Sequence, residues 1–160
     1  MPDCFEPEKR SWVMSRIRST GTTPETRLGG LLTKWFPETL IFINSRELPG
    51  TPDFALPEHR VAIFVDGCFF HGCPIHYREP KENSAYWIKK LRENRKRDRR
   101  VNKQLREEGW TVLRIWEHEL KGKKIVGRER IRRRLRYAVK KSRKLEQIRK
   151  VAESATSYET

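Results

Sequence analysis

One short segment of the chain concentrates side chains that bind metals. Cys68, Cys73 and His76 lie within nine positions of one another. Zinc prefers thiolate and imidazole ligands in closed tetrahedral sites, so these residues could supply three of its four ligands. His118, just past a later apolar run, is the best candidate for the fourth. The sequence therefore predicts a structural zinc site at these four residues; the alternative is two buried thiols and ordinary surface imidazoles.

Carboxylates near the same segment suit a different cation. Asp53 stands at the head of one candidate strand and Asp66 at the end of the next, so both could project at one edge of a sheet. Mg²⁺ is held by one or two carboxylates together with substrate phosphates. His71 could then deprotonate a water molecule, and Glu25 could orient that base or a metal-bound water. Any one of these acids alone is more simply an ordinary surface group.

Aromatic and basic residues accompany these groups. Phe69 and Phe70 precede His71, and Trp87 opens a basic stretch. In a DNA-binding protein such rings stack on bases or wedge between them, whereas the plainer interpretation is a buried core. The cations expected to contact DNA are Lys89, Arg95, Arg97 and Arg99.

The net charge of +15 is distributed very unevenly. Residues 1–80 hold 9 basic and 10 acidic side chains, whereas 81–110 hold 11 and 5, and 121–150 hold 15 and 2. A neutral half followed by basic segments favours a nucleic acid as partner over a membrane surface or an acidic protein. The three cysteines are an odd number, with Cys4 alone near the N-terminus, and they argue against a disulfide framework. With no apolar run of 18 residues and no signal-peptide pattern, we expect an intracellular protein without a membrane span.

The elements that must position these residues follow from periodicity and punctuation. Pro24 and Glu25 after a hydroxyl cap open a helix with an apolar stripe, which Pro37 ends. Residues 61–65 are continuously apolar, as in a strand covered on both faces. We predict helices over 24–36, 84–107 and 128–152, strands over 40–43, 53–56, 61–65 and 110–116, and a disordered tail over 153–160. These elements form one α/β domain spanning residues 1–152.

Five motifs together resemble a known enzyme family. They are TTPETRLGGLL, LPGTPDF, FVDGCFFHGCPIH, the stretch from Trp87 to Arg100 with NRKRDRR, and GWTVLRIWEHEL. In this order they resemble the very short patch repair (Vsr) DNA mismatch endonucleases over about residues 9–122. The resemblance implies the restriction-endonuclease-like α/β core of the PD-(D/E)XK nuclease superfamily, with a mixed sheet flanked by helices.

The resemblance also implies an activity. Vsr enzymes use Mg²⁺ to nick duplex DNA 5′ to the mispaired T of a T·G mismatch, which arises when 5-methylcytosine deaminates. It implies a cytoplasmic, nucleoid-associated monomer with a functional link to a cytosine-5 DNA methyltransferase and to MutL-type mismatch-repair proteins. Two competitors remain open: a sequence-specific nicking or homing-type endonuclease of the same fold, and a non-catalytic zinc-stabilised module that binds DNA or RNA.

The family's residue roles carry over by motif. Asp53 resembles the metal-binding aspartate, and the Val65 backbone carbonyl resembles the second protein ligand. His71 resembles the water-activating histidine and Glu25 the helix acid beside it, while Phe69, Phe70 and Trp87 match the rings that enter the DNA.

Three positions depart from the family pattern. Asp66 stands where a phosphate-contacting His is expected, and Val65 where Thr is expected; a carboxylate at 66 could add a metal ligand. His118 stands where a Cys ligand of zinc is expected. For the basic segment from residue 123 onward, we prefer a solvated helix packed on the sheet.

Overall fold

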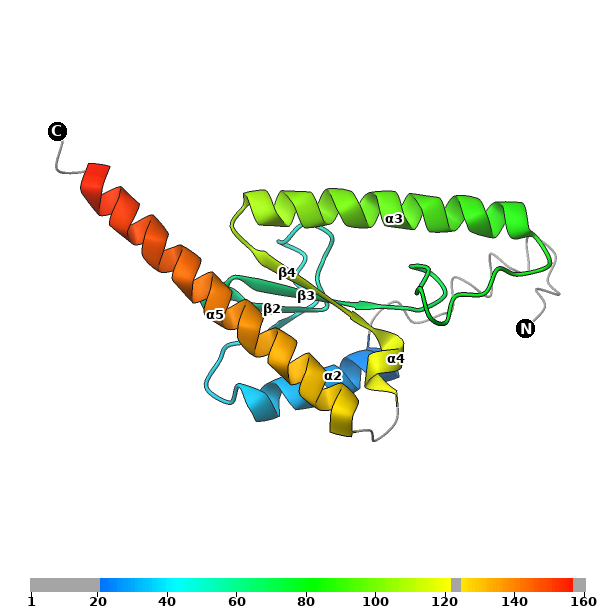
Figure 1. Cartoon of the computed structure of the whole chain (residues 1–160), viewed down its shortest axis with the longest axis horizontal. Coiled ribbons are helices and arrows are strands. Elements are labelled where there is room, and N and C mark those ends of the chain that lie inside the picture. Colours follow the sequence, from blue (N-terminus) through cyan, green and yellow to red (C-terminus); the bar gives the residue numbers. More distant parts are fainter. Residues whose placement is uncertain (1–20, 122–124, 157–160) are drawn as a thin grey trace.

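The computed structural model describes residues 21–121 and 125–156. In these residues a four-stranded sheet is flanked by helices (Figure 1). The helices are α2 (Thr23–Trp35), α3 (Ser84–Glu107), α4 (Glu117–Leu120) and α5 (Ile125–Thr156), with the 3₁₀ turn η1 (Pro57–His59). The strands are β1 (Phe42–Ile43), β2 (Phe54–Leu56), β3 (Val61–Asp66) and β4 (Thr111–Trp116).

The sheet is mixed, with strand order β1-β2-β3-β4. β1 and β2 are antiparallel, as are β2 and β3, whereas β3 and β4 run parallel through the α3 crossover. Asp66 pairs with Trp116, so the carboxyl ends of β3 and β4 meet at one edge of the sheet. The prediction of a mixed α/β fold with such an edge is confirmed.

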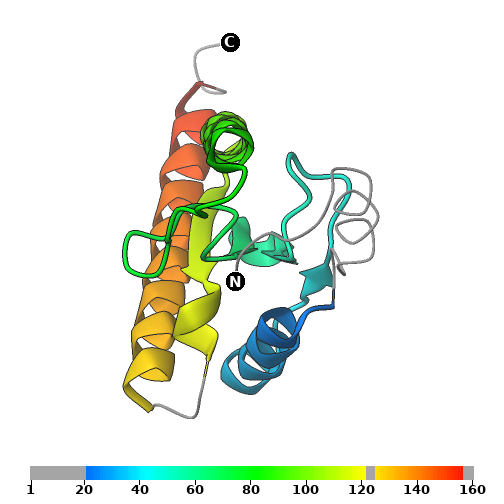
Figure 2. The same ribbon diagram turned by 90° about the vertical axis from the view of Figure 1, so that its right-hand side faces the viewer.

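Strand β3 forms the centre of the core because both of its faces are covered. Val61 and Ile63 pack into a cluster with side chains from α2 and α5, while Ala62 and Phe64 pack against α3. Figures 1 and 2 show α3 on one side of the sheet and α2 and α5 on the other. This burial of both faces explains the unbroken apolar run in β3, since side chains on either face of the strand pack against helices.

Several element boundaries differ from those predicted. The first strand covers only Phe42–Ile43, at an exposed sheet edge where its side chains have little to pack against. Helix α5 begins at Ile125 and runs to Thr156, into the stretch predicted to be disordered. The short elements η1 and α4 were missed because one turn carries no measurable periodicity. Cys4 and residues 157–160 lie outside the described residues.

The helices of the described ranges are all too polar or too short to cross a lipid bilayer.

Candidate active site

Asp53 is fixed at the start of β2 by backbone contacts. Its Oδ2 accepts a 2.7 Å hydrogen bond from the Val65 backbone N–H, and its carbonyl accepts one from the Asn44 N–H. The antiparallel pairing of β2 with β3 sets this geometry, because the residue before Phe54 falls beside the end of β3. The carboxylate therefore lies next to the Val65 backbone.

Asp53 is partly buried near two other acids. Burial, together with the charges of Glu25 and Asp66, raises the pKa of Asp53 to about 6 against the lowering effect of the Val65 hydrogen bond. Glu25 and Asp66 thus both lie within electrostatic range of Asp53. Buried like charges are costly unless a cation neutralises them, so this donor set fits a divalent cation.

Glu25 is held in place by the start of α2. Its carboxylate accepts hydrogen bonds from the Gly21 N–H (2.7 Å) and the Thr22 hydroxyl (2.6 Å). The prediction of a hydroxyl cap is wrong, because the N-cap residue is Thr22 and its side chain makes no capping bond to the helix backbone. Glu25 reaches back over the helix end, which orients a side chain that is only 9% exposed.

His71 is paired with an acid that sequence analysis did not single out. Its Nδ1 lies 2.6 Å from Oδ2 of Asp98 on α3 and 3.8 Å from Oδ1 of Asp66. Burial raises the pKa of Asp98, but the hydrogen bond from His71 and the charges of His71 and Arg114 outweigh it and lower that pKa. An ionised Asp98 accepts the Nδ1 proton, so Nε2 is the ring nitrogen that can take a proton from water.

A second residue missed from the sequence, Arg114, holds Asp66. Its guanidinium binds both oxygens of Asp66, at 2.7 and 2.8 Å, and also Oδ1 of Asp98 at 2.9 Å. Both new residues left a signal in the sequence. Arg114 is the single charge in the apolar run 110–116, and Asp98 is the single acid between Arg95 and Arg100. A lone charge in a buried strand requires a partner.

The four predicted zinc ligands form one group, the Cys/His cluster (Cys68, Cys73, His76 and His118). Their ligand atoms all lie within 4.8 Å of one another. The Cys68 Sγ to His118 Nδ1 distance is 3.2 Å, Cys73 Sγ lies 3.5 Å from the same nitrogen, and Cys73 Sγ to His76 Nδ1 is 3.8 Å. A tetrahedral zinc ion separates S and N ligands by about 3.5 Å, so these residues fit zinc.

The parallel pairing of β3 with β4 builds this cluster. Cys68 follows β3 directly, and His118 lies in the first turn of α4, directly after β4. The Cys68 N–H donates to the Glu117 carboxylate, which ties the two chain segments together. Burial and the neighbouring charge of His76 lower the pKa of His118, which favours the neutral imidazole that a metal requires.

Helix α3 holds the loop that carries His71. Asn94 Nδ2 donates to the Phe70 carbonyl (2.9 Å), and Arg95 Nη2 donates to the Gly72 carbonyl (2.9 Å). Gly72 has a positive φ of 66°, and a Cβ there would lie 2.5 Å from Arg95 Nη2. Only glycine fits this close approach without strain. Arg95 therefore supports the loop in addition to any contact with DNA.

The predicted wedge residues pack on one another. Phe69 lies edge-on to Phe70 (5.3 Å between ring centroids) and to Trp87 (5.0 Å). Trp87 is 8% exposed, whereas Phe69 and Phe70 are half-buried. In the free protein Trp87 thus supports the two phenylalanines, and its entry into DNA stays a prediction. Lys89, Arg95, Arg97 and Arg99 are exposed along α3.

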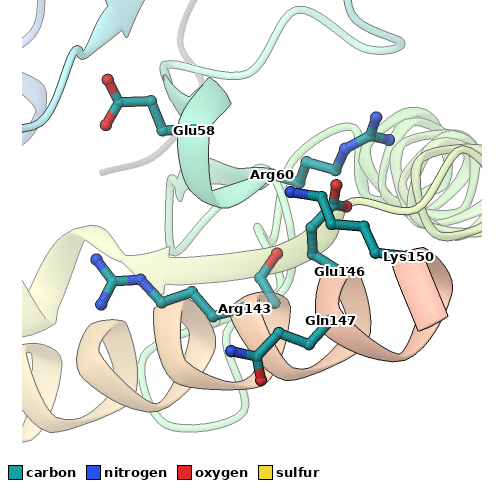
Figure 3. A pocket seen from close by; sticks show the side chains of 7 residues that line it. Glu58, Arg60, Arg143, Glu146, Gln147 and Lys150 are labelled. Atoms are coloured by element: carbon teal, nitrogen blue, oxygen red, sulfur yellow. The ribbon is translucent and has the colours of Figure 1, made fainter.

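A separate hollow of about 320 Å³ lies between η1 and the second half of α5 (Figure 3). Arg60, Arg143 and Lys150 line it together with Glu58 and Glu146. It adjoins the beginning of β3, whereas Asp66 ends that strand. This hollow is therefore distinct from the residues described above.

Comparisons with known proteins identify the family. Residues 2–76 match the family model described as DNA mismatch endonuclease Vsr. The type II nicking enzyme V.NaeI of Lentzea aerocolonigenes is 42% identical over 113 residues, which cover 69% of this chain and 68% of that protein. The DNA mismatch endonuclease Vsr of Escherichia coli K12 is 36% identical, covering 84% of this chain and 86% of that protein. The chain belongs to the Vsr endonuclease family.

Other Vsr-family relatives carry the nicking-enzyme name. The type II nicking enzyme V.XorIIP of Xanthomonas oryzae pv. oryzae is 39% identical, over 75% of this chain and 88% of that protein. Among solved structures, the catalytic domain of homing endonuclease I-Bth0305I covers 76% of the chain at 19% identity, with a TM-score of 0.48. The family assignment rests on the sequence matches.

The structure of this Vsr-family endonuclease brings most of the predicted site residues together. Glu25, Asp53, Asp66 and His71 gather near the start of β2 and the end of β3. Three ligands of the Cys/His cluster lie on the loop that carries His71, and the fourth, His118, lies in α4. We call the four carboxylates Glu25, Asp53, Asp66 and Asp98 the acidic cluster.

Proposed function

We propose that this Vsr-family endonuclease nicks duplex DNA on the 5′ side of the mispaired T in T·G mismatches, in very short patch repair. One observation carries the hydrolytic part of the proposal. Asp66 lies within electrostatic range of Asp53 and 3.8 Å from His71, so the candidate cation ligand and the candidate base flank the same residue. A single phosphodiester could then contact both, within a core of the restriction-endonuclease-like type.

The cation site is formed by Asp53 and the backbone carbonyl of Val65. Mg²⁺ bound there would supply Lewis acidity and lower the pKa of a coordinated water. The buried Asp53 carboxylate, with its pKa raised to about 6, gains from such neutralisation. Glu25, held by Gly21 and Thr22, orients water on the α2 side of Asp53.

The chain's own proton acceptor is Nε2 of His71. Asp98 accepts the Nδ1 proton and keeps the imidazole in the tautomer that leaves Nε2 basic. The proton removed from the attacking water goes to Nε2, and the pair His71–Asp98 then carries one additional positive charge. The ionised Asp98 stabilises that imidazolium.

The aromatic rings next to His71 recognise the mismatch in this proposal. Phe69 and Phe70 lie on the loop between Cys68 and His71, so insertion of these rings positions His71 on the adjacent backbone. A T·G pair is easier to unstack than a matched pair, which favours insertion at the mismatch. The exposed cations of α3, Lys89, Arg95, Arg97 and Arg99, neutralise phosphates along the duplex.

The Cys/His cluster binds a structural zinc ion in this proposal. The S to N separations of 3.2, 3.5 and 3.8 Å match a tetrahedral site, and all four positions are filled by protein. A closed site has no position for substrate, so its role is to fix the loop. The protein acts as a monomer, and MutL-type proteins and a cytosine-5 methyltransferase are its proposed functional partners.

A second candidate is nicking of matched duplex at a fixed sequence. The observation that favours it is the naming of several relatives as type II nicking enzymes. The same catalytic groups would serve, and only recognition would differ.

One assay separates these candidates. Otherwise identical T·G and T·A duplexes, labelled on either strand, are incubated with the protein in Mg²⁺ or in chelator. We expect nicking of the T·G duplex alone, 5′ to T, and only with Mg²⁺. Equal nicking of both duplexes would favour the sequence-specific enzyme, and binding without cleavage would favour a non-catalytic module.

An active-site variant completes the test. Asp53→Ala should retain DNA binding and lose nicking, because it removes the cation ligand and leaves α3 intact. Loss of both with the fold intact would contradict the ligand role of Asp53.

A further inference from the structure

Both carboxylate oxygens of Asp66 are bound by the side chain of Arg114. Asp66 is 4% exposed, and both of its oxygens accept hydrogen bonds from Arg114, with Nε to Oδ2 at 2.7 Å and Nη2 to Oδ1 at 2.8 Å. This is the bidentate geometry in which guanidinium and carboxylate bind most strongly. The positive charge next to Asp66 also offsets the charge that would attract a metal ion.

Arg114 is itself held from three directions. Its Nη2 also donates to Oδ1 of Asp98 (2.9 Å), and its Nη1 donates to the side-chain oxygen of Asn102 (3.1 Å). Its guanidinium carbon lies 4.7 Å from the centre of the Phe64 ring. A planar cation fixed by β3 and α3 in this way has little rotational freedom, so the groups that it binds are fixed as well.

Arg114 is linked to His71 through Asp98. Asp98 gives one oxygen to Arg114 and the other to His71 Nδ1, at 2.9 and 2.6 Å. Without the guanidinium, the two carboxylates of Asp66 and Asp98 would repel each other beside His71, and the Asp98 side chain could rotate away. Arg114 thus determines where Asp98 holds the imidazole.

We infer that Arg114 is the positioning residue of the catalytic histidine, and that Asp66 anchors Arg114 instead of binding the cation. This inference rests on the proposed function for His71 as base. It assigns Asp66, Arg114 and Asp98 to one hydrogen-bonded chain, and it leaves Asp53 as the acid side chain that binds the cation.

The test uses Arg114→Met, Arg114→Lys and Asp66→Asn in the full chain, with Arg130→Met as control. Arg130 also forms an ion pair with an acid, a single 2.8 Å contact to Glu119 of α4, but its side chain is more exposed than that of Arg114. Nicking of the T·G duplex is measured with saturating Mg²⁺ over a range of DNA concentrations. We expect kcat to fall about a hundredfold in Arg114→Met while KM changes little, and Arg130→Met to match the wild type. Unchanged kcat in a folded Arg114→Met would overturn the inference.

A spectroscopic readout tests the same point without activity. The Nδ1 proton of His71, bound to Asp98, should give a downfield resonance in the NMR spectrum, assigned by its loss in His71→Ala. It should disappear in Arg114→Met and persist in Arg130→Met. If Arg114→Met does not fold, Arg114→Lys serves instead, since lysine keeps the charge and cannot bridge both acids; persistence of the resonance there would overturn the inference.

Cation binding tests the role of Asp66. Calorimetric titration with Mn²⁺ as probe, in the absence of DNA, should give the same affinity for Asp66→Asn as for the wild type, and a loss of at least tenfold for Asp53→Asn. A tenfold loss in Asp66→Asn would make Asp66 a ligand and overturn the inference. If the wild type nicks no duplex, the proposed function fails, whereas the resonance and the titration still decide the arrangement of Arg114 and Asp66.

Discussion

The Cys/His cluster and the acidic cluster differ in how their buried polar groups are paired. In the Cys/His cluster, two buried thiols and two imidazoles stand at distances that one zinc ion would satisfy. In the acidic cluster, Arg114 binds both Asp66 and Asp98, whereas Asp53 receives a hydrogen bond from a backbone N–H and lies near two further acids. The first cluster is arranged to enclose one metal ion, whereas the second leaves the Asp53 carboxylate without an ion-pair partner among the described residues.

This difference teaches which groups serve stability and which serve reactivity. Burial and the neighbouring Cys73 raise the pKa of Cys68 to about 11. Without a metal, the Cys68 thiol therefore stays protonated and adds no ionic interaction that stabilises the fold. A bound zinc would convert that cost into folding free energy. Asp53, in contrast, costs stability in the magnesium-free protein, which is the expected sign for a group kept ready for a ligand.

The largest effect is expected from breaking the Cys/His cluster. Cys73→Ala should lose the zinc and lower the free energy of unfolding by at least about 3 kcal/mol, because structural zinc contributes about 10 kcal/mol or more to folding. Zinc content by mass spectrometry and urea unfolding check this. Cys4→Ser, which removes the one cysteine that is not among the four predicted ligands, is the control. Equal stability of the two variants would show that the cluster has no structural role.

The next effect is on rate alone. Asp98→Asn keeps the size of the side chain and removes its charge, so nicking should slow by about a hundredfold or more while DNA binding persists. Single-turnover nicking and equilibrium binding measure the two quantities. Glu107→Gln, at the exposed far end of α3, is the matched control. A slowed rate accompanied by lost binding would place Asp98 in the support of α3.

Substitution of Asp53 should raise the free energy of unfolding, whereas Cys73→Ala should lower it. The folded-state pKa of Asp53, about 6, lies above the ordinary 3.8, so the stability associated with its protonated form is present below about pH 4 and lost as the pH rises through 6. In magnesium-free buffer, Asp53→Asn should therefore be more stable than the wild type by about 3 kcal/mol at pH 7.5.

The same comparison at low pH supplies the control for that prediction. Urea unfolding at pH 4 should show little difference between Asp53→Asn and the wild type, since Asp53 is then protonated. A wild-type advantage at pH 7.5 would mean that the carboxylate stabilises the fold and that the contrast between the clusters is wrong.

The smallest effect is expected at the loop after β3, which carries His71 and three ligands of the Cys/His cluster. Asn94→Ala removes one hydrogen bond to the Phe70 carbonyl and should lower stability by about 1 kcal/mol. Zinc affinity and nicking rate should decline together, because Phe70 lies between Cys68 and His71. Thermal unfolding, zinc competition and nicking assays check this. A change in one property alone would show that the clusters are held independently.

The sequence was sufficient wherever the signal was local. The α3 prediction, 84–107, matches its observed bounds because composition and Gly109 mark both ends. Three of the four Cys/His ligands lie on one loop, and His118 followed from parallel strands ending together. The link from Asp66 through Arg114 to Asp98 was not predicted, because it joins β3, β4 and α3 through side chains with no fixed spacing. The length of α5 was underestimated, since helix ends without Gly or Pro have no clear stop signal.

The hydrogen bond that fixes Asp53 has a consequence for sequence variation. Its donor is the main-chain amide of Val65, so the identity of the side chain at that position does not enter the contact. Exchange between Val, Thr and Ile there is accordingly compatible with an intact carboxylate geometry, whereas proline would abolish the donor. Because the Val65 side chain also packs against the core, mutational scanning of position 65 should reveal tolerance of apolar and β-branched residues and loss of activity with proline.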